Sequence, residues 1–156
     1  MAKAGADGEK VLATNRKAFF NYHILERAEA GVVLRGTEVK AIREGGLHFR
    51  DSYVDFKGGE LFLVGASVSP YSHGNQLNHP EERTRKLLLH KREILKLGGK
   101  VTEKGLTLVP LRAYFRNGRV KLEIGLARGK QVHDKREAIK RKDLEREARQ
   151  AVRTRL

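Results

Sequence analysis

The chain has 156 residues and a formal net charge of +14, and 39% of its residues are hydrophobic. This apolar content suits a single folded domain and argues against general disorder. The absence of Cys excludes disulfides and thiolate metal sites, and no apolar run resembles a membrane helix or a signal-peptide core. We therefore expect a basic, cytoplasmic and monomeric protein without membrane association, whose first candidate partner is a polyanion.

The N-terminal part is predicted to begin with a disordered end over residues 1–12, which is rich in Ala, Gly and Lys. A folded body is predicted over 13–127. Its first elements are expected to be two strands, over 20–25 and 32–35, joined through Glu29-Ala30-Gly31.

Two helices are predicted to interrupt the strands of the body. The first runs from Thr37 to Arg43, with Thr37 as its N-cap. The second spans Glu81–Leu97 and ends before Gly98-Gly99. Its apolar residues in one sector of a helical wheel are Leu87, Leu88, Ile94 and Leu95. This wheel places Leu88 in the core.

Turn signals predict two β-hairpins. Lys57-Gly58-Gly59 separates strands over 51–56 and 60–65, and Asn117-Gly118 precedes an alternating strand that begins at Arg119. With a further strand over 106–111, about six short antiparallel strands are expected. We therefore predict a mainly β fold, a small closed antiparallel β-barrel with two or three accessory helices, because closure removes exposed strand edges.

The C-terminal tail, residues 128–156, is more basic than the body. It holds 11 basic and 5 acidic residues, a net charge of +6, against +8 for residues 1–127. Pairs such as Glu137 and Arg141 favour a helix, but large apolar residues are few. We predict a tail that is disordered alone and becomes helical on a polyanionic surface.

No catalytic centre is predicted. The segment Gly125–Lys130 is one residue short of a phosphate-binding loop, and Gly65–Ser69 lacks the second Gly of a nucleophile elbow. No His or acidic residues show a metal-ligand spacing. We therefore expect neither enzyme activity nor a metal or cofactor.

Composition favours a folded RNA over a single-stranded one as the polyanion. Lys and Arg side chains neutralise phosphates and release counterions, which gives tight but salt-sensitive association. The six Phe and four Tyr, with no Trp, provide little surface on which single-stranded bases could stack. Recognition of an RNA by its shape is therefore expected.

Six blocks of residues occur in the same order as in a known family. They are Asn15-Arg16-Lys17-Ala18, Glu29-Ala30-Gly31, Gly36-Thr37-Glu38-Val39-Lys40, Asp51-Ser52-Tyr53, Arg85-Lys86-Leu87-Leu88-Leu89-His90-Lys91, and Gly129-Lys130 with Asp134-Lys135-Arg136. Over these blocks the sequence resembles the small protein B (SmpB) family, the transfer-messenger RNA (tmRNA, SsrA) binding proteins of bacterial trans-translation.

The resemblance implies an oligonucleotide-binding-like (OB-like) barrel that binds the tRNA-like domain of tmRNA. The elongation factor that carries aminoacyl-tRNA would deliver the complex, through the RNA, to the A site of a stalled ribosome. Translation would then switch to the RNA's own reading frame, which tags the unfinished protein for degradation. The basic tail would lie as a helix in the empty mRNA channel.

The resemblance also implies roles for individual residues. RNA-binding positions are Glu29, Leu88 and Lys121, with Asn15 and Arg16 as phosphate contacts. The segment near the decoding centre comprises Gly129, Lys130, His133, Asp134, Lys135 and Arg136, and His133 would stack on an rRNA base. The alternation of residues 119–126 independently points Lys121 outward. Gln131 replaces a Lys that is usual in the family.

Two other classes of protein remain as alternatives. A ribosomal structural protein would stay on ribosomes through a salt wash. A basic nuclease would need a metal- or His-dependent centre, for which the sequence offers no candidate.

Overall fold

The computed structural model describes residues 9–72, 78–130 and 132–155. In this part of the chain six antiparallel strands form a closed ring in the order β8-β4-β5-β7-β2-β9, and β9 pairs again with β8. The ring strands are β2 (Tyr22–Val32), β4 (Tyr53–Lys57), β5 (Glu60–Val64), β7 (Arg85–Leu88), β8 (Thr107–Arg116) and β9 (Arg119–Gly129). The prediction of a mainly β fold is confirmed.

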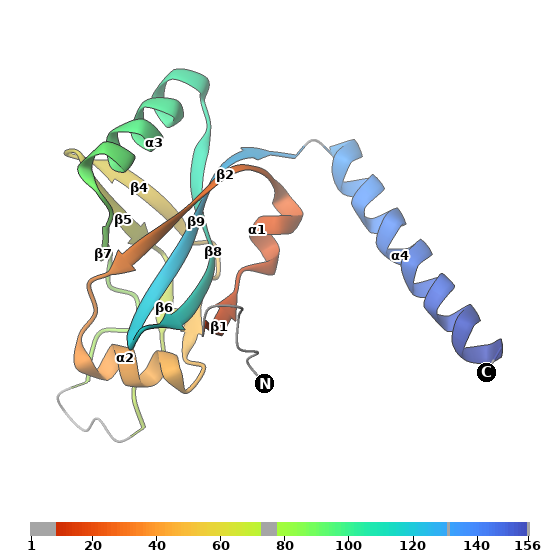
Figure 1. Cartoon of the computed structure of the whole chain (residues 1–156), viewed down its shortest axis with the longest axis horizontal. Helices are drawn as coiled ribbons and strands as arrows, with labels where there is room; N and C mark the ends of the chain where they lie inside the picture. The colour runs from red at the N-terminus through yellow and green to blue at the C-terminus, as the bar shows by residue number, and fades with distance from the viewer. Residues whose placement is uncertain (1–8, 73–77, 131, 156) are drawn as a thin grey trace.

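The remaining elements surround the ring. Strand β1 (Lys10–Thr14) pairs with β8 outside it, and β3 (Leu47–His48) pairs with β6 (Ser67–Val68). The helices are α1 (Arg16–Asn21), α2 (Gly36–Arg43), α3 (Lys91–Lys104) and α4 (Val132–Arg155). Helices α2 and α3 lie at opposite ends of the ring, and α4 extends away from it (Figure 1).

The hydrophobic core fills the ring. Leu61, Leu87, Leu108 and Leu122, from four different strands, are at most 1% exposed. A second, smaller cluster lies outside the ring, where Ala18 packs α1 against β8 and β9. Because α1 is only six residues long, this packing rather than intrinsic propensity keeps it in place.

Both predicted hairpins are confirmed. Asn117 and Gly118 have φ angles of 51° and 75°, the positive values that a type I′ turn requires. The turn joins β8 directly to β9 and sets the register that pairs Arg116 with Arg119. The other turn, at Gly58 and Gly59, likewise joins β4 to β5.

The predicted helix over Glu81–Leu97 is wrong at both ends. Arg85–Leu88 forms strand β7, in which Leu87 points into the core while Leu88 is 52% exposed, because side chains alternate along a strand. The predicted core position of Leu88 is therefore also wrong. The helix begins at Lys91 and continues through Gly98, where a Cβ atom would lie 2.7 Å from the ring of Phe56. Gly98 thus lets α3 approach β4 and does not end the helix.

The N-terminal expectations also need correction. Residues 10–12, predicted to be disordered, belong to β1, and residues 1–8 lie outside the described part. Residues 22–32 form one continuous strand, β2, in place of the predicted strand pair, since β2 is hydrogen-bonded to β9 and β7 and needs no turn at Glu29-Ala30-Gly31. Gln131 lies outside the described residues.

The start of α2 differs from its prediction as well. The residue before its first turn is Arg35, not Thr37, and the Glu38 carboxylate accepts a hydrogen bond from the backbone N–H of Arg35 at 2.8 Å. The Thr37 hydroxyl instead lies 2.9 Å from Nδ1 of His79.

A buried ion pair joins α2 to β7. Glu38 and Arg85 are both at most 1% exposed, and Nε of Arg85 donates to Oε2 of Glu38 at 2.7 Å. Arg83 donates to the other carboxylate oxygen. Burial alone would raise the pKa of Glu38, but the hydrogen bonds from Arg35, Arg83 and Arg85 outweigh burial and lower this pKa.

Candidate nucleic-acid interface

Two of the residues implied in RNA binding flank one glycine on the outer face of the ring. Gly31 of β2 pairs with Leu88 of β7 on one side and with Lys121 of β9 on the other. Ala30, next to Gly31, is fully buried in the core, so position 31 faces outward. Three neighbouring strands therefore bring Leu88, Gly31 and Lys121 together, although 90 positions of sequence separate Gly31 from Lys121.

Glu29 lies on the same face, two residues along β2 from Gly31. Its carboxylate accepts hydrogen bonds from the Tyr114 hydroxyl and, at 3.1 Å, from Nη1 of Arg116. Tyr114 is directly paired with Lys121 in the β8–β9 ladder. Glu29 thus links β2 to β8 by hydrogen bonds, close to Lys121 of β9.

The electrostatics of this face keep Glu29 ionised. The hydrogen bond from Tyr114, opposed by partial burial and supported by the charges of Arg116 and Lys121, lowers the pKa of the Glu29 carboxyl. Burial, together with Glu29, raises the pKa of the Tyr114 hydroxyl, which therefore stays a hydrogen-bond donor. A lone negative charge would repel phosphates. The Glu29 carboxylate is not alone, because it holds Tyr114 and Arg116 in place by hydrogen bonds.

The network continues across the sheet as alternating charges. Arg112 of β8 bonds to Glu9 at 2.9 Å and to Glu123 at 3.4 Å, and Arg27 of β2 bonds to the same Glu123 at 3.2 Å. The guanidinium of Arg112 lies 4.6 Å from the centre of the Tyr114 ring. These pairs hold the outer face of β2, β8 and β9 as a pre-ordered polar surface.

Asn15 and Arg16 lie at the start of α1, which packs on the outer side of β8 and β9. Asn15 is 6% exposed: its Nδ2 donates to the Pro110 carbonyl at 2.8 Å, and its Oδ1 accepts from the Ala18 N–H at 3.3 Å. These bonds cap α1 and attach it to β8. Arg16 is exposed.

The residues implied near the decoding centre span the junction between β9 and α4. Gly129 still pairs with Tyr22, and Lys130 donates from its backbone to Asn21 at 2.9 Å and from Nζ to Phe19 at 3.3 Å. Asp134 lies 3.3 Å from Nε2 of His23. His133, Asp134, Lys135 and Arg136 all belong to the first turns of α4. The ordered body therefore continues three residues beyond the predicted boundary at Ala127.

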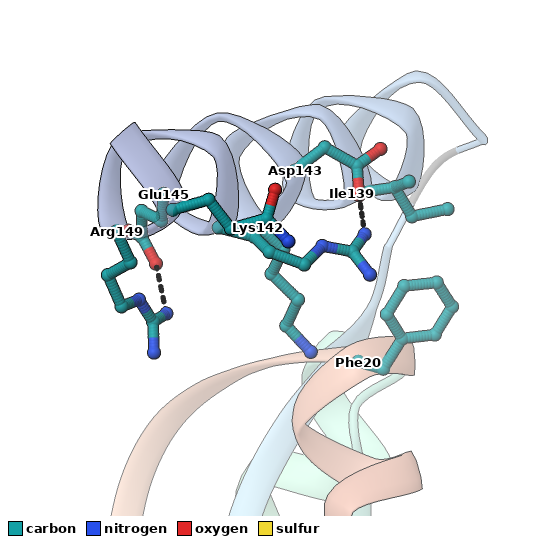
Figure 2. A pocket seen from close by; sticks show the side chains of 8 residues that line it. Phe20, Ile139, Lys142, Asp143, Glu145 and Arg149 are labelled. Carbon is teal, nitrogen blue, oxygen red and sulfur yellow. Dashed lines mark hydrogen bonds and ion pairs between the residues drawn. The ribbon is translucent and has the colours of Figure 1, made fainter. Parts of the chain in front are cut away.

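Helix α4 is a basic helix with little contact to the body. Figure 2 shows Phe20 of α1 and Lys142 of α4 on the two sides of an open cavity of about 710 Å³. Along α4, Ile139 and Leu144 are 48% and 57% exposed. The structure shows the tail as a helix; its predicted disorder in isolation stays a prediction.

Sequence reasoning missed three residues of this interface. Gly31 belongs to the Glu-Ala-Gly block, but only the alternation of β2 shows that it lies between Leu88 and Lys121. Tyr114 could have been found by counting outward from the Asn117-Gly118 turn, which places it opposite Lys121. Arg116, one of the two groups that hold the carboxylate of Glu29, follows from the same register.

Within residues 9–72, 78–130 and 132–155, no group of three or more His or acidic side chains is placed to hold a metal ion. In the same ranges, no helix is both long enough and apolar enough to cross a membrane.

An ordered face with an exposed leucine and a half-buried lysine, on a body that also carries a separate basic helix, is typical of the class of proteins that bind a polyanion. The family model described as SmpB protein matches residues 12–154. The chain belongs to the SmpB protein family.

Relatives and a solved structure agree with this assignment. The SsrA-binding protein of Carboxydothermus hydrogenoformans is 54% identical over 147 residues, covering 94% of this chain and 99% of the relative. That of Persephonella marina is 56% identical and covers 90% and 92%. A chain from a structure described as "tmRNA-SmpB: a journey to the center of the bacterial ribosome" is 48% identical, with a TM-score of 0.66, and covers 81% of this chain and 93% of its own.

Proposed function

We propose that this chain binds the tRNA-like domain of tmRNA and acts with it in trans-translation on stalled ribosomes. The observation that carries this proposal is the convergence of Glu29, Leu88 and Lys121 on one face, in a chain of the SmpB family. The protein works in the cytoplasm, as a monomer and as an RNA-binding factor without catalysis, metal or cofactor. The elongation factor that carries aminoacyl-tRNA meets it through the RNA.

The strand ring supplies the RNA-binding body, and we assign it to the OB-like barrels. Lys121 contacts a phosphate, and Leu88 adds apolar contact. Glu29 acts by holding Arg116 and Tyr114, and Asn15 by fixing α1 so that Arg16 can reach a phosphate. We assign Glu29 and Asn15 these indirect roles because their side chains are already hydrogen-bonded within the protein.

Helix α4 supplies the second surface, for the ribosome. Residues 131–156 hold 9 basic and 5 acidic residues, and α4 has small contact with the body. A basic helix of this kind fits a channel walled by rRNA phosphates, and mRNA in the channel would exclude it by sterics. The segment from Gly129 to Arg136 then lies near the decoding centre, with His133 on an rRNA base.

A charge-removing variant tests the RNA-binding face. Lys121→Ala should weaken binding to a transcript of the tRNA-like domain about threefold to tenfold and reduce the slope of log K against log salt by about 1, because one phosphate contact is lost. The control is Lys96→Ala on α3, which removes an exposed cation elsewhere and should leave the slope nearly unchanged. An equal change in both variants, or a wild-type slope for Lys121→Ala, would place Lys121 outside the interface.

A further inference from the structure

A groove with a volume of about 440 Å³ opens where β2, β7 and the start of β9 meet α2. We call it the Gly31 groove, after one of the residues that line it. Its lining is mostly aliphatic, from Val32, Leu34, Val39, Leu88 and Val120, and it includes the cations Arg119 and Lys121. An aliphatic groove with cations at one end has the chemistry of a nucleotide site, apolar for the base and positive for the phosphate.

Gly31 leaves space in the lining of the groove, because position 31 has no side chain. A Cβ atom built there would lie 3.3 Å from Cβ of Leu88, tighter than ordinary van der Waals contact. The backbone of Gly31 does not need a glycine, because its φ is not positive and it lies in a regular ladder between Leu88 and Lys121. The missing side chain at this position therefore provides space.

Leu88 forms an exposed wall of the groove. It is 52% exposed on a strand whose other outward residue, Lys86, is charged and paired with Glu60. Exposure of a leucine costs free energy that burial by a ligand would recover. No aromatic side chain lines the groove, so a base would be held by aliphatic packing, as by the apolar wedges that proteins insert beside bases.

Polar groups that can hydrogen-bond to the edge of a base lie near the groove. Glu29 lies two residues from Gly31 on the same face and accepts bonds from Tyr114 and Arg116, while a carboxylate offers about four acceptor positions. Lys121 supplies a donor and a positive charge close to Glu29. The groove therefore offers an apolar lining with two cations, and the acceptor Glu29 lies beside it on β2.

We propose that the Gly31 groove receives one unstacked base of the bound RNA, with its phosphate on Lys121 and Arg119. This inference rests on the proposed function, because it names the part of the RNA that the same face holds. Unpaired bases in loops of folded RNA are the elements that proteins recognise individually. Gly31 thereby becomes a determinant of RNA binding, through the space that it leaves.

The test measures binding of the full chain to a transcript of the tRNA-like domain, and to versions in which each unpaired loop nucleotide in turn is made abasic. Leu88→Ala and Gly31→Val should each weaken binding to the intact transcript about tenfold with an unchanged salt slope, because an apolar contact is lost. One abasic position should weaken wild-type binding by a similar factor and have little further effect on either variant.

Leu95→Ala is the matched control. Leu95 on α3 is 53% exposed, so the substitution is chemically the same at nearly equal exposure, and binding should stay within about twofold of wild type. Thermal unfolding of all three variants checks that the fold is kept. If Gly31→Val unfolds, Gly31→Ala replaces it, since its added methyl group crowds Leu88 alone within 4 Å.

The outcomes separate the inference from the function on which it rests. Wild-type affinity in Leu88→Ala and Gly31→Val would overturn the base site while leaving the tmRNA function intact. The same holds if the loss of affinity in each variant simply adds to the loss caused by every abasic position, because no single base would then depend on the groove. Variants that bind RNA normally but fail in tagging would also overturn it, because the groove would then take a protein side chain. A wild-type chain that does not bind the transcript would overturn the proposed function and the base site together.

Discussion

Glu29 shows how a negative residue can serve a surface that binds a polyanion. Its carboxylate holds the Tyr114 hydroxyl and the Arg116 guanidinium, and it lies close to Lys121. The lowered pKa of Glu29 keeps this charge in place throughout the neutral pH range. We therefore propose that Glu29 contributes to RNA binding through the positions of its neighbours.

The variant Glu29→Ala separates this positioning role from simple charge. Removal of an acidic group makes the protein more basic, and charge alone would strengthen RNA binding. We expect binding to weaken about threefold to tenfold instead, because Tyr114 and Arg116 lose their acceptor. Glu29→Gln retains an acceptor for the Tyr114 hydroxyl and should lose less affinity. Tighter binding by Glu29→Ala at physiological salt would refute the positioning role.

At the scale of elements, the buried pair of Glu38 and Arg85 determines how α2 meets the ring. Arg85 also donates to the carbonyls of Ala66, Glu81 and Arg83. Loss of either partner leaves an uncompensated buried charge, which typically costs about 3–5 kcal/mol. The two residues lie in separate sequence blocks, so the blocks hold structural as well as RNA-binding residues.

Glu38→Gln should therefore lower the free energy of unfolding at pH 7 by about 3–5 kcal/mol, measured by urea denaturation. The pH dependence has a defined sign. Because the folded-state pKa of Glu38 is lowered, its contribution to stability is present above the ordinary value of 4.5 and is lost as the pH falls through the folded-state pKa. The Gln variant should show a shallower loss of stability below pH 4.5. Equal acid sensitivity in both proteins would contradict this role.

Local signals predicted some elements, and long-range contacts decided others. The Asn117-Gly118 turn carries its own backbone preference, and it correctly predicted the β8–β9 hairpin. The run around Leu88 fits a helix or a strand equally well, and its state depends on Arg85 finding Glu38, 47 positions away. The exposure of Leu88, one of the three residues that carry the candidate site, could therefore not be predicted without the fold.

The whole molecule divides its positive charge between two surfaces. The ring presents Lys121 on an ordered face, and α4 carries a separate set of cations on a helix that the body hardly contacts. Lys130 still belongs to the body, because it bonds to Asn21 and Phe19. A cut that separates the two surfaces must therefore follow Lys130, since a cut after Ala127 would remove part of β9.

Truncation after Lys130 tests this division most directly, with two measurements on one protein. The truncated chain should bind the tRNA-like domain of tmRNA within about threefold of the full chain at physiological salt, because the ring is intact and only α4 is lost. It should fail to support tagging on ribosomes stalled at the end of a truncated mRNA. Tagging at the full-length level, or a loss of RNA affinity of tenfold or more, would contradict the assignment of the ring to tmRNA and of α4 to the ribosome.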